Sequence, residues 1–156
     1  LHTPVSAAAR FLLPDESERL RQSLEVRAAL EPEIARRVAE RASDGEIAGL
    51  AAIHARLETA PDLFSAMESD LAFHRELARL SGNELFGLML DSIADLGRES
   101  RRATMSEAGV GRAVKQHGAI LKAISSRDAK AAEKAMRVHI ETAVADLVAH
   151  LGRKGE

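Results

Sequence analysis

Two segments of the sequence carry an aspartate and a histidine four residues apart, a spacing that can hold one metal ion. Asp70 and His74 form the first pair, and Asp146 and His150 form the second. Residues four apart on a helix project from the same face, so both side chains of a pair can reach a single ion. Asp146 and His150 fall near the end of a predicted helix, where exposure is expected. We therefore interpret the second pair as surface residues.

The surroundings of Asp70 and His74 favour the first pair as a site. Both residues share a helical stripe with Met67 and Leu77, which predicts that they point into the protein. A buried carboxylate without a partner is costly, so Asp70 requires a cation. That cation is either a metal ion or a neighbouring arginine.

Two further histidines lie on inward stripes of later helices. His117 shares a face with Leu121 and Ile124, and His139 lies beside Met136. Taken singly, such histidines are more often hydrogen-bonded core residues than metal ligands, and we interpret His54 in that way. Taken together, one aspartate and three neutral histidines form a ligand set suited to zinc, nickel, cobalt, iron or manganese. Such a set leaves positions open for water or a small ligand.

Arg27 is the remaining residue with a chemical signal, because it interrupts an apolar helix face. A buried guanidinium needs an anion, and its planar fork matches a carboxylate. Glu31 lies four residues later and is the internal candidate partner. The carboxylate of a bound substrate or effector is the alternative, and the sequence leaves both open.

The composition of the chain limits its fold class and the kinds of site it can form. The chain has 156 residues, 46% of them hydrophobic and only 3% aromatic, which fits one all-α domain with a sizeable core. Absence of cysteine excludes disulfides and thiolate ligands. Lysine and arginine number 22 against 24 aspartate and glutamate residues, so a basic nucleic-acid surface is not expected. No segment has the length and apolarity of a membrane span, and we expect a cytoplasmic protein.

The apolar periodicity predicts an antiparallel bundle of about six to seven helices joined by short loops. We expect a kink at Pro32, one continuous helix over 84–105 with an inward stripe that includes Leu85, Leu88 and Met89, and a loop over 106–111. The charged run 98–102 is expected on a solvated face. The predicted helices span 15–31 and its continuation beyond Pro32, 47–58, 62–80, 84–105, 112–124 and 129–151.

From about Leu24 onward the chain resembles the FadR-type C-terminal domain of GntR-superfamily bacterial transcription regulators. The resemblance rests on an ordered series of short motifs. These are Leu24-Glu25-Val26-Arg27, Leu30-Glu31-Pro32, Asp70-Leu71-Ala72-Phe73-His74, Ser81-Gly82-Asn83, Gln116-His117 before Ile120-Leu121-Lys122-Ala123-Ile124, and Asp128 followed by Ala132, Met136 and His139.

The resemblance implies an effector-sensing, homodimeric domain that binds a divalent metal ion, zinc first, through Asp70, His74, His117 and His139. It assigns Arg27 to the pocket for a small carboxylate or sugar-acid effector. Operator DNA would be bound by an N-terminal winged helix-turn-helix that this chain lacks. We accordingly expect residues 1–19 to be a linker or remnant, 20–152 the metal- and effector-binding domain, and 153–156 a tail.

Two alternatives accompany this interpretation. The same four ligands could serve a metal-dependent enzyme acting on a small organic acid. We predict no catalytic residues, because Glu31 is the only inward group visible as a proton shuttle and Arg27 can occupy it. In the other alternative the domain is a structural bundle, Asp70 pairs with a nearby arginine, and the histidines are core residues.

Overall fold

The computed structural model describes residues 4–154 and shows eight α-helices in that range. Residues 1–3 and 155–156, the ends of the predicted linker and tail, lie outside the described residues. Over 4–154 no strand is present, which confirms the all-α prediction. The helices are α1 (Pro4–Leu12), α2 (Glu16–Arg41), α3 (Asp44–Glu58), α4 (Leu63–Leu80), α5 (Glu84–Ser92), α6 (Ala94–Thr104), α7 (Glu107–Ser125) and α8 (Ala129–Lys154).

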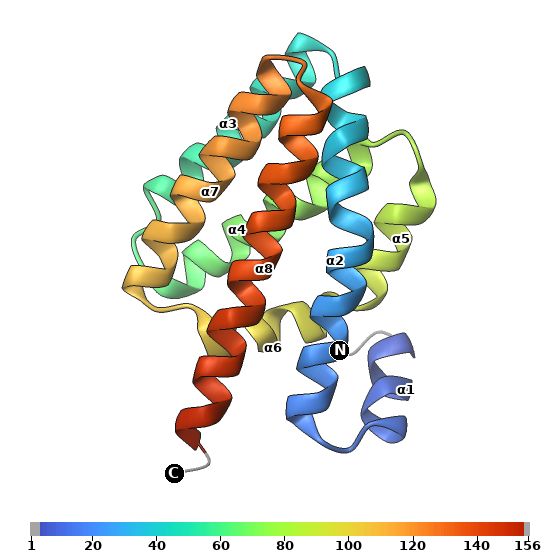
Figure 1. Cartoon of the computed structure of the whole chain (residues 1–156), viewed down its shortest axis with the longest axis vertical. Helices are drawn as coiled ribbons and strands as arrows, with labels where there is room; N and C mark the ends of the chain where they lie inside the picture. The colour runs from blue at the N-terminus through green and yellow to red at the C-terminus, as the bar shows by residue number, and fades with distance from the viewer. Residues whose placement is uncertain (1–3, 155–156) are drawn as a thin grey trace.

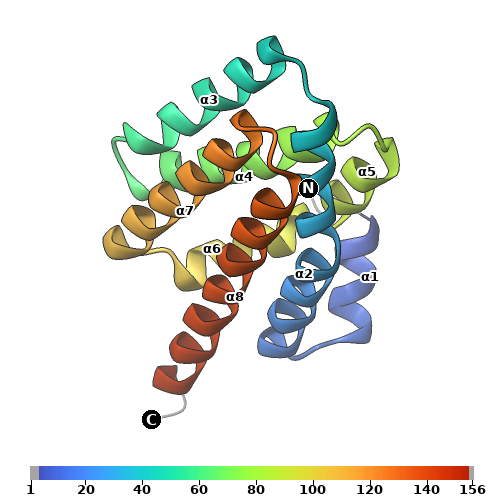
Figure 2. The same cartoon turned by 45° about the horizontal axis from the view of Figure 1, so that its top comes forward.

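The two longest helices, α2 and α8, pack along each other and form the spine of the bundle (Figure 1). Helix α7 packs on α8, and α3 packs on both α4 and α7 (Figure 2). The short helix α6 contacts α2, α4 and α8, while α1 lies against α2, α5 and α6. Helices α2, α4, α6, α7 and α8 therefore all reach the centre of the molecule.

Side-chain caps begin most of these helices. Asp15, Asp62, Asn83 and Ser106 each accept a hydrogen bond from a backbone N–H in the first turn of the helix that follows. Ser43 and Glu46 form the predicted capping box at the start of α3. Ser106 begins a helix directly, so the expected loop over 106–111 is wrong.

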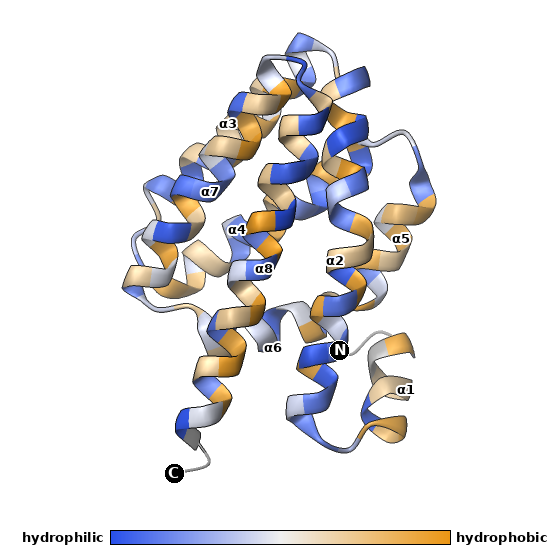
Figure 3. Ribbon diagram, in the orientation of Figure 1, coloured by the Kyte–Doolittle hydropathy of each residue, from blue (hydrophilic) through white to orange (hydrophobic). Residues whose placement is uncertain are grey.

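Apolar side chains from most helices form the main core. Hydrophobic and hydrophilic residues are interspersed along α2, α7 and α8 (Figure 3). The core is built around Val38, Phe73, Leu77, Ile120 and Met136, all essentially inaccessible to solvent. None of the described helices is both long and apolar enough to cross a bilayer.

Three local expectations need correction or qualification. The predicted helix over 84–105 is divided at Ile93 into α5 and α6. Leu85, Leu88 and Met89 of α5 are 63%, 66% and 47% exposed, so the expected buried stripe is wrong there. Helix α2 continues through Pro32 without interruption, so the proline does not end it. Helix α1 lies inside the segment 1–19, whose role as a linker stays a prediction.

Candidate metal centre

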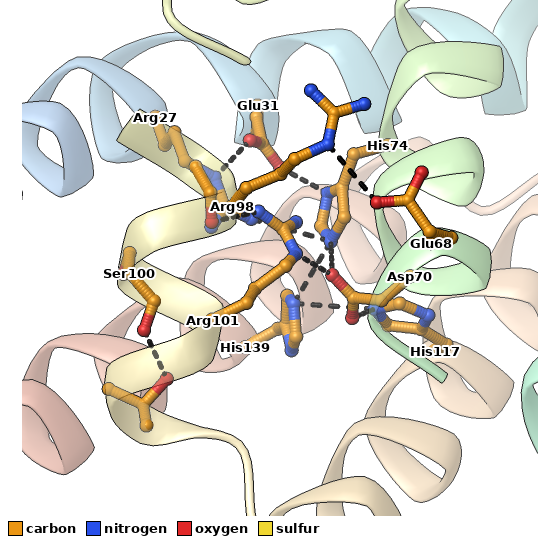
Figure 4. Close-up of polar contacts among 12 residues, drawn as sticks. Arg27, Glu31, Glu68, Asp70, His74, Arg98, Ser100, Arg101, His117 and His139 are labelled. Atoms are coloured by element: carbon orange, nitrogen blue, oxygen red, sulfur yellow. Dashed lines mark hydrogen bonds and ion pairs between the residues drawn. The ribbon is translucent and has the colours of Figure 1, made fainter. Parts of the chain in front are cut away.

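The structure brings Asp70, His74, His117 and His139 together at one point in the interior (Figure 4). Asp70 and His74 lie one turn apart on α4, His117 comes from α7 and His139 from α8. All four side chains are buried, and one ligand atom from each lies within 4.8 Å of the others. Residues from three helices thus converge as the inward stripes predicted.

The spacing of the donor atoms fits a four-ligand metal centre. The Nε2 atom of His139 lies 3.2 Å from Nε2 of His74 and 3.3 Å from Nε2 of His117. Oδ1 of Asp70 lies 3.3 Å from Nε2 of His117. Two ligands about 2.0–2.1 Å from a tetrahedral zinc ion would lie about 3.3 Å apart. The donor types and these three separations therefore suit a zinc-sized ion.

Hydrogen bonds beyond the four residues fix the orientation of His139. The Thr142 hydroxyl donates to the carbonyl oxygen of Val138 (2.9 Å), so it accepts a hydrogen bond from the Gln116 amide nitrogen (2.8 Å). The Gln116 carbonyl oxygen then faces Nδ1 of His139 at 2.9 Å, which places the imidazole proton on Nδ1. Nε2 consequently turns its lone pair toward the centre, as a metal ligand requires.

His74 and His117 are held by different means. Glu31 Oε2 lies 2.5 Å from Nδ1 of His74 as an ion-pair contact, without the angles of a hydrogen bond. Nη2 of Arg27, which can only donate, faces Nε2 of the same ring at 3.4 Å and favours a lone pair there. The His117 ring stacks on Phe73, with ring centroids 4.2 Å apart and planes 13° from parallel. Its Nδ1 atom has no hydrogen-bond partner, so no polar contact outside the four residues orients the ring.

Two buried guanidinium groups border the centre. Arg27 donates from Nε to Glu31 Oε1 at 2.6 Å, so the internal pair left open by the sequence is present. Nη2 of Arg27 also lies 3.4 Å from Nε2 of His74. Arg101 of α6 donates from Nε to Asp70 Oδ2. The expectation that residues 98–102 all lie on a solvated face is therefore wrong for Arg101, which is buried.

Burial and neighbouring charge set the protonation states. Burial by itself would raise the pKa of Asp70, but Arg101 and the surrounding histidines hold that pKa well below its usual value. Glu31 is likewise buried, and Arg27 and His74 lower the pKa of its carboxyl. Burial lowers the pKa of His139 to about 3 and that of His117 well below its usual value. Both carboxylates are thus charged and both of these histidines neutral at pH 7, the states that metal ligands need.

Two small cavities flank the centre. One, of about 50 Å³, is lined by Arg27, Asp70, Arg101 and His139 together with polar groups such as Thr104 and Arg112. The other, of about 20 Å³, lies on the side of Glu31 and His74 and is also bordered by Arg27 and Arg101. The guanidinium groups of Arg27 and Arg101 therefore lie between the two cavities.

Two further histidines of the described residues, His54 and His150, stay outside the centre. His54 is buried, with its ring centroid 6.2 Å from that of Phe73 and 6.3 Å from that of His117, in keeping with a structural role. Asp146 forms an ion pair with Arg112 at 2.7 Å. His150 borders a separate surface hollow beside Arg10 and Glu99.

Sequence reasoning missed Arg101 and Gln116. Ala94, Gly97 and Arg101 follow one another at spacings of three and four, the same inward signal that singled out Arg27. Arg101 also lies within the charged run 98–102, which favours a solvated face and masks this inward signal. Gln116 gave no comparable signal, because its role depends on where α8 places His139.

Comparison with known proteins identifies the family of this fold. The family model described as the FCD domain matches residues 22–142, most of the chain and all four residues of the centre. The chain belongs to the FCD domain family. Over 124 residues this FCD domain is 31% identical to the HTH-type transcriptional repressor NanR of Citrobacter rodentium. That match covers 76% of the chain and 47% of NanR, so the chain spans about half the length of this curated relative.

Solved structures agree with the assignment. Streptococcus agalactiae GntR superposes with a TM-score of 0.75 at 27% identity, over 88% of this FCD domain and 63% of that chain. A structure described as the metal-free FCD domain of TM0439 gives a TM-score of 0.71 at 20% identity, over 88% and 96% of the two chains. The second likeness shows the fold alone. The relatives confirm the expected membership of the GntR superfamily of transcription regulators.

Proposed function

We propose that this FCD domain binds a divalent transition-metal ion through Asp70, His74, His117 and His139, with zinc as the first candidate. The observation that carries the proposal is the convergence of the four ligand atoms within 4.8 Å in a buried site. The outer contact of His139 adds support, because Gln116 faces its Nδ1 and turns Nε2 toward the common point.

The proposed ligand of the metal-bound domain is a small carboxylate or sugar acid. Two guanidinium groups already match the carboxylates of Asp70 and Glu31, so a dication adds two positive charges without counterions. An anion in the 50 Å³ cavity would face the metal, Arg27 and Arg112. This volume holds only a few water molecules, so a sugar acid requires the cavity to widen.

In the whole protein we propose that the effector controls operator binding by an N-terminal winged helix-turn-helix. The support is the likeness to NanR, described as a transcriptional repressor, and to a GntR protein. An effector changes DNA binding only if its affinity differs between the two arrangements of the regulator, with a typical coupling of about 1–3 kcal/mol. A homodimer would read two operator half-sites.

The first test is elemental analysis of the purified protein and of three variants. We expect close to one equivalent of a transition metal in the wild type, lost in His74→Ala and His117→Ala. His54→Ala is the matched control, since it removes a buried histidine next to the centre without removing a ligand atom. A wild-type protein that stays metal-free after incubation with zinc would contradict the proposal.

The second test is a screen of small carboxylates against the zinc-loaded protein by calorimetry, with product analysis of the same mixtures. We expect saturable binding without turnover, weakened in Arg27→Ala. Conversion of any acid to product would instead support the metal-dependent enzyme.

A further inference from the structure

Arg101 has an unusual position, because its guanidinium lies in the protein interior on the carboxylate that the metal would need. It donates from Nε to Asp70 Oδ2 and from Nη1 to the carbonyl oxygen of Gly97 at 3.1 Å. A Cβ atom on residue 97 would lie 3.1 Å from Nη1, tighter than most real contacts. Glycine at this position therefore leaves room for the guanidinium to fold back along α6 onto Asp70.

The neighbouring guanidinium makes a second contact with a proposed ligand. Nη2 of Arg27 lies 3.4 Å from Nε2 of His74, the atom that faces the centre. Two of the four proposed ligand side chains thus contact a guanidinium. The two arginines therefore already place positive charge against side chains that a dication would contact.

The surroundings of Arg101 offer space for another position of its side chain. It borders both the 50 Å³ and the 20 Å³ cavity, so empty volume lies on either side of the guanidinium. Ser100 and Thr104 of the same helix line the larger cavity, which also contains Arg112. A guanidinium displaced in that direction would join the groups that face a bound anion.

We propose that Arg101 is an internal counterion that competes with the metal for Asp70 and, once displaced, becomes an anion-binding group of the effector cavity. The inference rests on the proposed metal site and adds an order of events to it. A dication on Oδ1 of Asp70 repels the guanidinium that Arg101 places on Oδ2 and weakens that contact, and the released guanidinium then favours an anionic ligand. By reciprocity an anion that binds Arg101 in this position must raise the affinity for the metal.

Helix α6 links this exchange to the N-terminal side of the fold. Glu99, two residues before Arg101, pairs with Arg10 of α1. Any shift of α6 that accompanies release of Arg101 would therefore move Glu99 relative to Arg10 and alter the contact of α6 with α1.

The experiment measures zinc affinity by competition with a chromophoric chelator, with and without millimolar acetate. It compares the wild type with Arg101→Met and with Arg98→Met, a half-exposed control on the same helix that pairs with Glu68. We expect Arg101→Met to bind zinc at least about fivefold more tightly than the wild type. We also expect acetate to tighten zinc binding in the wild type and in Arg98→Met but not in Arg101→Met.

Gly97→Ala provides a second variant in case Arg101→Met folds poorly. It keeps the charge but crowds the inward position of the guanidinium, so zinc affinity should rise by a smaller factor. Weaker zinc binding in Arg101→Met would show that Arg101 supports Asp70 as a ligand, and would overturn the inference, as would unchanged affinity. If neither the wild type nor Arg101→Met bound zinc, the proposed metal site itself would be wrong.

Discussion

Helices α4, α7 and α8 each serve two adjoining regions of the interior, one apolar and one polar. On α7 the proposed ligand His117 is followed three residues later by Ile120, and on α8 Met136 precedes His139 by three. On α4 the core residue Phe73 is three residues from Asp70. On each of these helices, residues less than one turn apart therefore belong to the main core and to the proposed metal centre.

The two regions hold together for different reasons. The apolar core gains free energy in proportion to the surface it removes from water and needs no particular partner for each atom. The polar centre depends on pairing, because each of Asp70, Glu31, Arg27 and Arg101 is a buried charge with one opposite charge in contact. Removing one group from the centre leaves another uncompensated, whereas removing one from the core leaves a cavity.

The largest expected effects come from one deletion in each region. Asp70→Ala should lower the free energy of unfolding by about 3–5 kcal/mol, because Arg101 stays buried without its carboxylate. Ile120→Ala should lower it by about 2–5 kcal/mol through the cavity it creates. Urea unfolding with and without zinc distinguishes the effects of the two substitutions. Stabilisation by zinc should vanish only in Asp70→Ala, and its loss in Ile120→Ala would contradict the division into two regions.

Glu31→Gln tests the pairing within the polar centre. The glutamine keeps the shape of the side chain but removes the charge that orients His74 and matches Arg27. We expect zinc affinity to fall by about tenfold to a hundredfold, measured by chelator competition. Glu33→Gln, on the half-exposed side of α2, should leave it unchanged. Equal effects of the two substitutions would mean that the charge acts at long range and not by orienting His74.

Lower pH should weaken the metal-free protein chiefly through the buried histidines of the polar centre. His117 and His139 have pKa values below that of an unfolded histidine, about 6.5, so the unfolded chain takes up protons that the folded chain does not. Their contribution is complete above pH 6.5 and is lost as pH falls toward 3 for His139. Between pH 6.5 and 5 the loss should reach about 2 kcal/mol for each histidine. Urea unfolding in the presence of a chelator at pH 7 and pH 5 measures this loss of unfolding free energy. Equal stability at the two pH values would contradict the prediction.

Sequence patterns were sufficient for most of the fold, since caps and apolar stripes are local signals. The capping box at Ser43 and the inward stripe of α4 were both predicted and are present. The helix break at Ile93 was not, because residue 93 continues an apolar stripe and nothing in the local sequence marks a stop. The turn is favoured by the packing of α6 across α2, α4 and α8, which no local pattern encodes.

For the candidate centre, spacing predicted which residues point inward but not which of them pair. Asp70, His74, His117 and His139 were each placed on an inward stripe, and the fold brings them together. Arg101 shares such a stripe but lies within a run of surface charges, and its partner Asp70 comes 31 residues earlier in the chain. Contacts between helices decide such pairs, so they become visible only once the packing is known.

Ser43→Ala makes the smallest change. It tests whether the fold can be destabilised outside the polar centre without an effect on the centre. Ser43 accepts a hydrogen bond from the Glu46 backbone N–H at 3.3 Å, and its own N–H donates to the Glu46 carboxylate at 2.8 Å. Loss of this cap should cost about 1 kcal/mol of unfolding free energy. Zinc affinity should not change, because α3 supplies no ligand. A parallel fall in zinc affinity would instead mean that the packing of α3 on α4 and α7 sets the ligand geometry, and that the two regions are one cooperative unit.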